Sequence, residues 1–145
     1  MTHQPCLLVS ALVILAAGSA SAQGRGTTEL SPLPPHATWD TLYHLYRHPG
    51  PDFVDDGSTA EALSQFVVHR LATRWSTVRS LATLVAADSA FGAFVLKHVD
   101  ATTEVSELHR IVRYASSSCP PSGSSLCRAL GAAARDAIAQ AAQPN

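Results

Sequence analysis

The sequence predicts a single all-α domain of about five helices, an irregular helical bundle with a central long helix and an αα-hairpin. Three observations support this fold class. Apolar residues recur with helical spacing through most of the 145-residue chain. No segment alternates apolar and polar residues between hairpin turns, as a strand would. No motif recurs at a fixed period, so a repeat architecture is not expected.

The first 22 residues have the layout of a secretory signal peptide. An apolar run from Cys6 to Ala17 is followed by small residues that end in Ala20-Ser21-Ala22, which predicts cleavage before Gln23. The run is shorter than the ~20 residues of a membrane-spanning helix. We therefore expect a periplasmic or secreted protein with no stable membrane span after cleavage.

The expected mature chain begins with a flexible leader, residues 23–37, which is rich in glycine, threonine and proline. A helical domain over residues 38–142 follows. Its first helix begins near Thr38 and ends before Pro49, because proline cannot continue a helix. One side of this helix is apolar and carries Trp39, Leu42, Tyr43 and Tyr46.

The longest predicted helix covers residues 59–86. Ser58 followed by Glu61 has the spacing of a capping box at its start. No glycine or proline interrupts the apolar series that follows, so we expect one long helix or two collinear helices. The series has a heptad-like spacing and consists of Val67, Leu71, Val78, Leu81 and Val85.

Three further helical segments follow. Asp88 is the expected N-cap of a helix with Phe91, Phe94, Val95, His98 and Val99 along one side. Thr102 or Thr103 can cap the next helix, and the two helices together are typical of an αα-hairpin. The last helix has a face of small residues that permits close packing, and its apolar positions are Leu126, Leu130, Ala133, Ala134, Ala137, Ile138 and Ala141.

Two of the three cysteines, Cys119 and Cys127, lie beyond the N-terminal apolar run. In an exported protein such a pair is more often a disulfide than two free thiols. Their spacing is too long for a C-x-x-C redox site or a zinc knuckle. The residues between them are proline, serine and glycine, a turn composition that brings the sulfur atoms together. We predict a structural disulfide, with redox or metal chemistry as the alternative.

The charge balance gives no reason to expect nucleic acid as a partner. Ten basic and 11 acidic residues leave a formal net charge of −1. The local motifs of nucleotide-binding loops, serine hydrolases and zinc proteases are all absent. Their absence argues against an enzyme without excluding one, because catalytic groups can be brought together by folding alone. We expect no cofactor.

Arg74 interrupts the apolar pattern of the longest predicted helix. In a continuous helix Val67, Arg74 and Leu81 share one heptad position, which places a guanidinium in the apolar seam. Arg70 lies one turn earlier at the edge of the same stripe, and Trp75 is adjacent. A residue that breaks a local pattern is often part of a functional or strained site.

Two interpretations of this arginine are open. In a cleft, a guanidinium is suited to bind an anion or a partner protein, which makes Arg70, Arg74 and Trp75 the candidate binding residues. In a purely structural role, the stem of Arg74 packs on the core and its head pairs with an acid such as Asp88 or Asp100.

A weaker pattern is a set of metal-ligand residue types on the first helix. His44 and His48 are one turn apart, and Asp40 lies one turn before them. Neighbouring members can share a zinc ion, but a straight helix cannot bring all three to one ion, so the alternative is a solvated polar face. The three aspartates of residues 52–56 lack the calcium-loop spacing and are expected to be turn residues.

Two classes of function follow from the sequence. The first is a non-enzymatic binding, inhibitor or helper protein of the bacterial cell envelope, whose partner is another exported protein. A small helical domain with a disulfide and no catalytic motif favours this class. The alternative is a small envelope hydrolase or metal-dependent enzyme that uses the histidines.

Overall fold

Six α-helices and two short 3-10 helices make up the part of the chain that the structure, a computed structural model, describes: residues 33–34 and 36–143. No strand occurs among these residues, which confirms the all-α class. The predicted signal peptide lies outside the described residues. In chain order the elements are α1 (Trp39–Arg47), α2 (Gly57–Thr73), η1 (Trp75–Thr77), α3 (Val78–Ala87), α4 (Ser89–Lys97), α5 (Val105–Ser117), η2 (Pro121–Gly123) and α6 (Ser124–Ala141).

Helix α1 has the predicted start and the predicted apolar face. The Thr38 hydroxyl accepts a hydrogen bond from the Thr41 backbone N–H, and the Thr41 hydroxyl accepts one from the Thr38 N–H. This reciprocal pair satisfies two backbone donors that the first helical turn leaves free. Trp39 and Leu42 are buried, and Leu33 and Ala37 are buried with them. The core therefore includes residues of the segment that was expected to be a leader.

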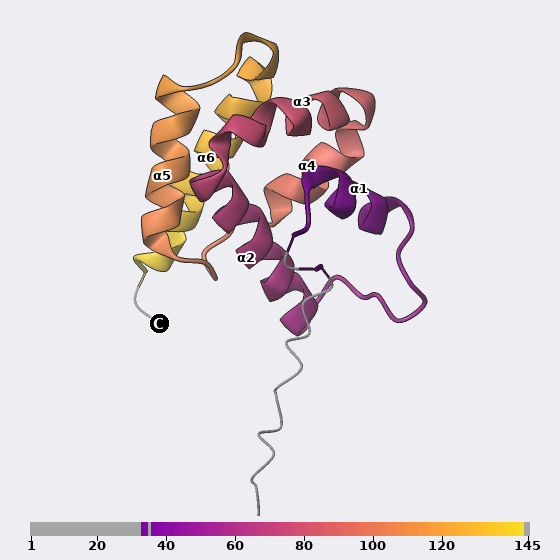
Figure 1. Ribbon diagram of the computed structural model, residues 1–145. Helices are drawn as coiled ribbons and strands as arrows, with labels where there is room; N and C mark the ends of the chain where they lie inside the picture. The colour runs from indigo at the N-terminus through magenta and orange to yellow at the C-terminus, as the bar shows by residue number, and fades with distance from the viewer. Residues whose placement is uncertain (1–32, 35, 144–145) are drawn as a thin grey trace, which may run out of the picture.

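The predicted long helix of residues 59–86 is wrong, because the chain changes direction between α2 and α3 (Figure 1). Arg74 ends α2 in a non-helical conformation. Trp75 then turns into the core, where its indole N–H donates to the Ser118 carbonyl at 2.9 Å. The Thr77 hydroxyl donates to the Arg74 carbonyl at 2.8 Å. Tertiary packing of Trp75 and this local bond replace the helical hydrogen bonds that a continuous helix would have had.

The start of α2 also differs from the prediction. Its N-cap is Asp56, whose side chain makes no capping bond, so the expected capping box of Ser58 and Glu61 is not formed. Gly57 has a φ of 47°, a left-handed conformation that glycine adopts without steric cost. The chain turns into the helix at this residue.

The Asp88 N-cap of α4 is confirmed, because its carboxylate accepts from the Phe91 backbone N–H at 3.2 Å. The N-cap of α5 is Glu104 and makes no side-chain cap bond, so the expected threonine cap is wrong. Thr102 and Thr103 instead donate their hydroxyl hydrogens to Asp100. These bonds close the turn between α4 and α5.

An αα-hairpin is present, but α5 and α6 form it rather than α4 and α5. Figure 1 shows these two helices side by side on one side of the molecule. The predicted disulfide between Cys119 and Cys127 joins the segment after α5 to the first turns of α6. Gly131 on α6 is buried, and a Cβ there would lie 3.2 Å from Ala115 Cβ on α5. The small residues of α6 therefore permit the close packing that their pattern predicted.

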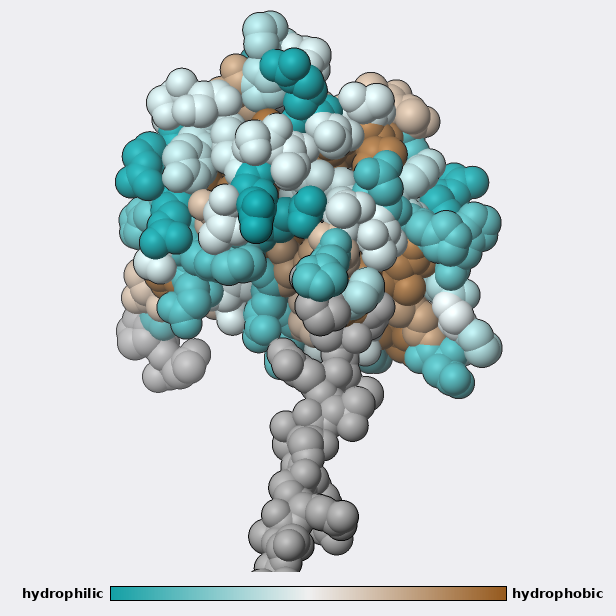
Figure 2. Space-filling view, viewed as in Figure 1, coloured by the Kyte–Doolittle hydropathy of each residue, from teal (hydrophilic) through white to brown (hydrophobic). Residues whose placement is uncertain are grey.

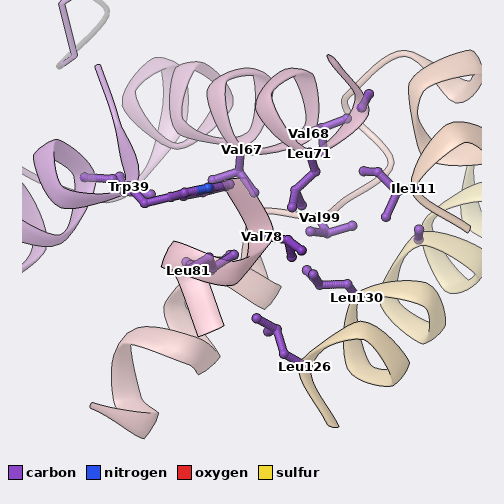
Figure 3. Close-up of a cluster of buried hydrophobic side chains, with 14 of the residues drawn as sticks. Trp39, Val67, Val68, Leu71, Val78, Leu81, Val99, Ile111, Leu126 and Leu130 are labelled. Atoms are coloured by element: carbon purple, nitrogen blue, oxygen red, sulfur yellow. The ribbon is translucent and has the colours of Figure 1, made fainter. Parts of the chain in front are cut away.

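The core is formed where α2 crosses the other helices. Figure 3 shows Val67, Val68 and Leu71 of α2 pointing towards side chains of α3, α5 and α6. Four of the five predicted seam residues are buried, and Val85 is partly buried. The largest fully buried side chains are Trp39, Phe91, Leu42, Leu63, Leu71, Leu81, Leu108, Ile111, Leu130 and His98.

The surface seen in Figure 2 is mostly hydrophilic, with hydrophobic residues visible near α1 and the loop that follows it. Val54 in that loop and Val105 at the start of α5 are the large hydrophobic residues that are exposed among the described residues. Within the same part of the chain, no helix is both long and apolar enough to span a bilayer.

Candidate functional site

A cavity of 390 Å³ lies along the outward side of α2, between the segment before α1 and the end of η1. We call it the α2 pocket. The lining residues that the structure describes include two arginines and two histidines and no acidic residue. They are His36, Ala37, Phe66, His69, Arg70, Thr73, Arg74 and Thr77.

Arg70 is held firmly at the base of this pocket. One terminal nitrogen of its guanidinium donates to the Ala37 carbonyl at 2.7 Å. The guanidinium carbon lies 5.7 Å from the ring centre of Trp39 and 5.9 Å from that of Phe66, within the range of cation–π attraction. The Nε atom is buried and has no hydrogen-bond partner among the described residues. Arg70 is therefore fixed in place, and its second terminal nitrogen, which makes no hydrogen bond in the described chain and is not buried, is the donor that a ligand can reach.

Arg74 is exposed at the end of α2, so its predicted place in the apolar seam is wrong. The seam requires a continuous helix, and the helix ends one residue earlier. The acids suggested as partners bind other groups, Asp88 with Arg47 and Asp100 with Ser64. Within the described chain the Arg74 guanidinium has no hydrogen bond or ion pair, and it lines the α2 pocket.

The two arginines repel each other across the pocket. Burial lowers the pKa of Arg70, the positive charge of Arg74 lowers it further, and the charge of Asp40 acts in the opposite direction. The residues that line the pocket supply no carboxylate to offset the repulsion. A bound anion would supply the missing negative charge, and a guanidinium offers a fork of N–H donors that matches a carboxylate or phosphate.

Trp75, the third predicted binding residue, lies elsewhere. It is buried in the core and lines a different cavity, together with Arg79 and Cys119. The aromatic residues at the α2 pocket are Phe66, in its wall, and Trp39, which lies beneath Arg70. The structure therefore places Arg70 and Arg74 in one pocket and the side chain of Trp75 outside it.

The histidines predicted as metal ligands are adjacent on α1. The ring centres of His44 and His48 are 5.0 Å apart, and both side chains are exposed. No group of three or more histidine, cysteine or acidic residues gathers in a metal-binding arrangement within the described chain. The zinc site stays a prediction, and His44 and His48 are its two candidate ligands.

A second polar cluster lies inside the protein and was not predicted. Ser64 of α2 and His98 at the end of α4 are each only 1% exposed. The Ser64 hydroxyl donates to Asp100 at 2.6 Å and lies 3.1 Å from His98 Nδ1. Because the hydroxyl has one hydrogen and gives it to Asp100, Nδ1 must be the donor in its contact with Ser64.

The other side of the His98 ring faces the loop between α1 and α2. Nε2 lies 3.3 Å from Asp55 Oδ1, yet neither atom has a hydrogen-bond partner among the described residues. In the neutral ring Nε2 carries a lone pair, so two acceptors face each other. Burial lowers the pKa of His98, while the negative charge of Asp55 opposes this effect and Lys97 adds to it. Lys97 also binds the other Asp55 oxygen at 2.7 Å.

This buried cluster does not have the arrangement of a serine-hydrolase triad. In a triad the serine gives its proton to the histidine, whereas Ser64 gives its proton to a carboxylate. Neither Ser64 nor His98 is exposed enough to meet a substrate. The geometry points to a structural role that joins α2, α4 and the loop after α1.

Searches of protein-family models, of curated proteins and of solved structures found no match to this chain.

The part of the pocket that α2 contributes is visible as a pattern in the sequence. Phe66, Arg70 and Thr73 follow each other at helical spacing, so they share the outward side of α2 with Arg74. The contribution of His36 and Ala37 carries no local signal, because these residues lie more than 30 positions away from Arg70 and reach it only through folding.

Replacing each arginine separately should distinguish a fixed side chain from an available one. Arg74→Leu should change the free energy of unfolding by less than about 0.5 kcal/mol, because the exposed guanidinium has no partner in the described chain. Arg70→Leu should cost about 1–2 kcal/mol through the lost bond to Ala37 and the lost aromatic contacts. Urea denaturation of both variants checks this order, and a larger loss for Arg74→Leu would contradict it.

Proposed function

We propose that this chain is a small, exported, non-enzymatic binding protein that captures another exported protein through the α2 pocket. The observation that carries the proposal is the exposed Arg74 guanidinium beside a fixed Arg70 in a pocket without a described acidic lining residue. Such a pair favours an anionic group of the partner. The disulfide and the signal-peptide layout support export to an oxidising compartment.

The physical basis of capture is that one hydrogen-bond donor group is already oriented before the partner binds. Arg70 is already oriented by Ala37 and by two aromatic rings, so little side-chain entropy is lost when it binds an anion. Arg74 adds a second guanidinium, which is exposed. Arginine residues are enriched among the side chains that dominate the free energy of protein–protein binding.

No contact in the described chain favours the hydrolase alternative. Ser64 and His98 are buried and bonded to each other, and Ser64 donates its hydrogen to Asp100. The α2 pocket has no described nucleophilic cysteine or carboxylate in its lining, and both of its threonine hydroxyls are donated to backbone carbonyls. These contacts suit binding better than catalysis.

Capture of a protein from the exported fraction of the source organism tests the proposal. The mature protein and its Arg128→Gln variant should retain the same partner in stoichiometric amount, because Arg128 is an exposed residue of α6 that does not line the pocket. The Arg74→Gln variant should lose at least about 90% of it, the effect of removing an interface anchor worth about 1.4 kcal/mol or more. Equal capture by Arg74→Gln and Arg128→Gln would contradict the proposal.

A further inference from the structure

The ligand class of the α2 pocket can be narrowed from the contacts around its two arginines. We infer that the pocket takes a single carboxylate attached to an apolar group, as at the end of a peptide chain whose last residue is apolar. This inference rests on the proposed binding function and specifies the group of the partner that is recognised.

The number of available donors favours one negative charge. One terminal nitrogen of Arg70 donates to the Ala37 carbonyl and Nε is buried, which leaves the other terminal nitrogen as the donor that a ligand can reach. Arg74 contributes one further guanidinium at the rim. Two guanidiniums, one of them partly used, match the two oxygens of a carboxylate.

The wall of the pocket favours an apolar group next to that charge. Phe66 lines the pocket beside Arg70 and is only partly buried, so part of this residue remains accessible to a ligand. The ring is held in place by an edge-on contact with Trp39, at 6.0 Å between ring centres. Burial of apolar area against such a fixed wall adds binding free energy that a bare inorganic anion cannot gain.

The neighbouring surface of α2 disfavours larger negative charges on the ligand. A second cavity, lined by Gln65, His69, Thr102, Thr103, Glu104 and Glu107, shares His69 with the α2 pocket. Glu107 accepts a hydrogen bond from His69 Nδ1 at 2.8 Å. Glu104 lines the same cavity, whose described lining contains no lysine or arginine. These acids repel a doubly charged phosphate or a polyanion that extends past His69, which is specificity by like-charge repulsion.

Four small probes test this assignment in the mature protein by calorimetric titration. They are 3-phenylpropionate, its uncharged amide, acetate and inorganic phosphate. We expect 3-phenylpropionate to bind at least about tenfold more tightly than acetate or phosphate, and the amide to bind at least about tenfold more weakly than 3-phenylpropionate. Arg74→Gln should weaken 3-phenylpropionate about tenfold or more, whereas the matched control Arg128→Gln should leave its affinity unchanged.

Each contrary outcome overturns the inference. Tighter binding of phosphate than of 3-phenylpropionate would assign a phosphate site, and equal binding of the acid and its amide would show that the charge is not recognised. Unchanged affinity of Arg74→Gln for 3-phenylpropionate would place the binding site elsewhere. Absence of any binding of 3-phenylpropionate at about 10 mM would show that the pocket is not a carboxylate site. The proposed capture of a partner protein is decided separately, by whether Arg74→Gln loses that partner.

Discussion

Acidification from about pH 7 to about pH 5 should lower the free energy of unfolding of the wild-type protein, mainly through His98. Burial lowers the pKa of this histidine in the folded state below its ordinary value of 6.5. As the pH falls below that ordinary value, the unfolded chain takes up a proton that the folded chain does not. Folding stability is therefore fully present above pH 6.5 and decreases through the window down to the folded pKa, by at most about 1.4 kcal/mol per pH unit.

A pair of variants isolates this effect in urea denaturation at several pH values. His98→Leu removes the titrating group and places an apolar side chain among buried neighbours. The hydrogen bond from Ser64 to Asp100 can remain in this variant. It should flatten the dependence between pH 5 and 7 that the wild type shows. His109→Gln, a change on the exposed side of α5, should keep the wild-type slope. A slope that survives in His98→Leu would contradict the assignment.

A second loss of stability is expected at lower pH, from Asp100. Burial opposes ionisation of this carboxyl, but hydrogen bonds from Ser64 and Thr102 outweigh it and hold the pKa below its ordinary value of 3.8. The stabilisation is therefore present above pH 3.8 and is lost as the pH falls through the folded pKa. The two acid-sensitive groups are thus separated in pH, although Ser64 contacts both of them.

Reduction of the disulfide should lower the free energy of unfolding by about 2.5 kcal/mol. The bond closes the connection between α5 and α6, which form the most extensive helix–helix contact in the described part of the chain. Opening it increases the conformational freedom of the unfolded chain more than that of the folded one. Urea denaturation with and without a reductant measures the difference.

The double variant Cys119→Ser, Cys127→Ala is the control for this experiment. Alanine is used at position 127 because that side chain is buried and a serine hydroxyl there would need a partner, whereas Cys119 is only partly buried. The variant should be destabilised to a similar degree and should not respond to the reductant. Two thiols that react with a labelling reagent in native, unreduced protein would rule the disulfide out.

Apolar periodicity predicted the positions of most helices, because residues on the buried face of a helix recur in the sequence at helical spacing. The break after Thr73 was not predictable in this way. No glycine or proline marks it, and its cause is the packing of Trp75 against the Ser118 carbonyl, which lies 43 positions away. The hairpin was likewise assigned to the wrong pair of helices, since sequence order alone does not say which neighbours pack closely.

The candidate site was predicted only in part. Arg70 and Arg74 were singled out because Arg74 interrupts an apolar series, but the structural reason is different: the two residues are one turn apart at the exposed end of α2. The buried cluster had a weaker signal, a histidine in the otherwise apolar series of α4. Its partners Asp55 and Ser64 come from two other segments, so the cluster emerges only in the folded chain.

Side-chain nuclear magnetic resonance of the arginine Nε–H groups tests the central claim, that the α2 pocket binds an anionic group, most directly. During titration of the mature protein with 3-phenylpropionate, we expect the Arg70 and Arg74 signals to shift together and to saturate with one affinity. The Nε–H signal of Arg70 is the more informative of the two, because this atom is buried and has no partner in the described chain. The signals of Arg113 and Arg128 should not move. Shifts at Arg113 or Arg128 with none at Arg70 would contradict the account.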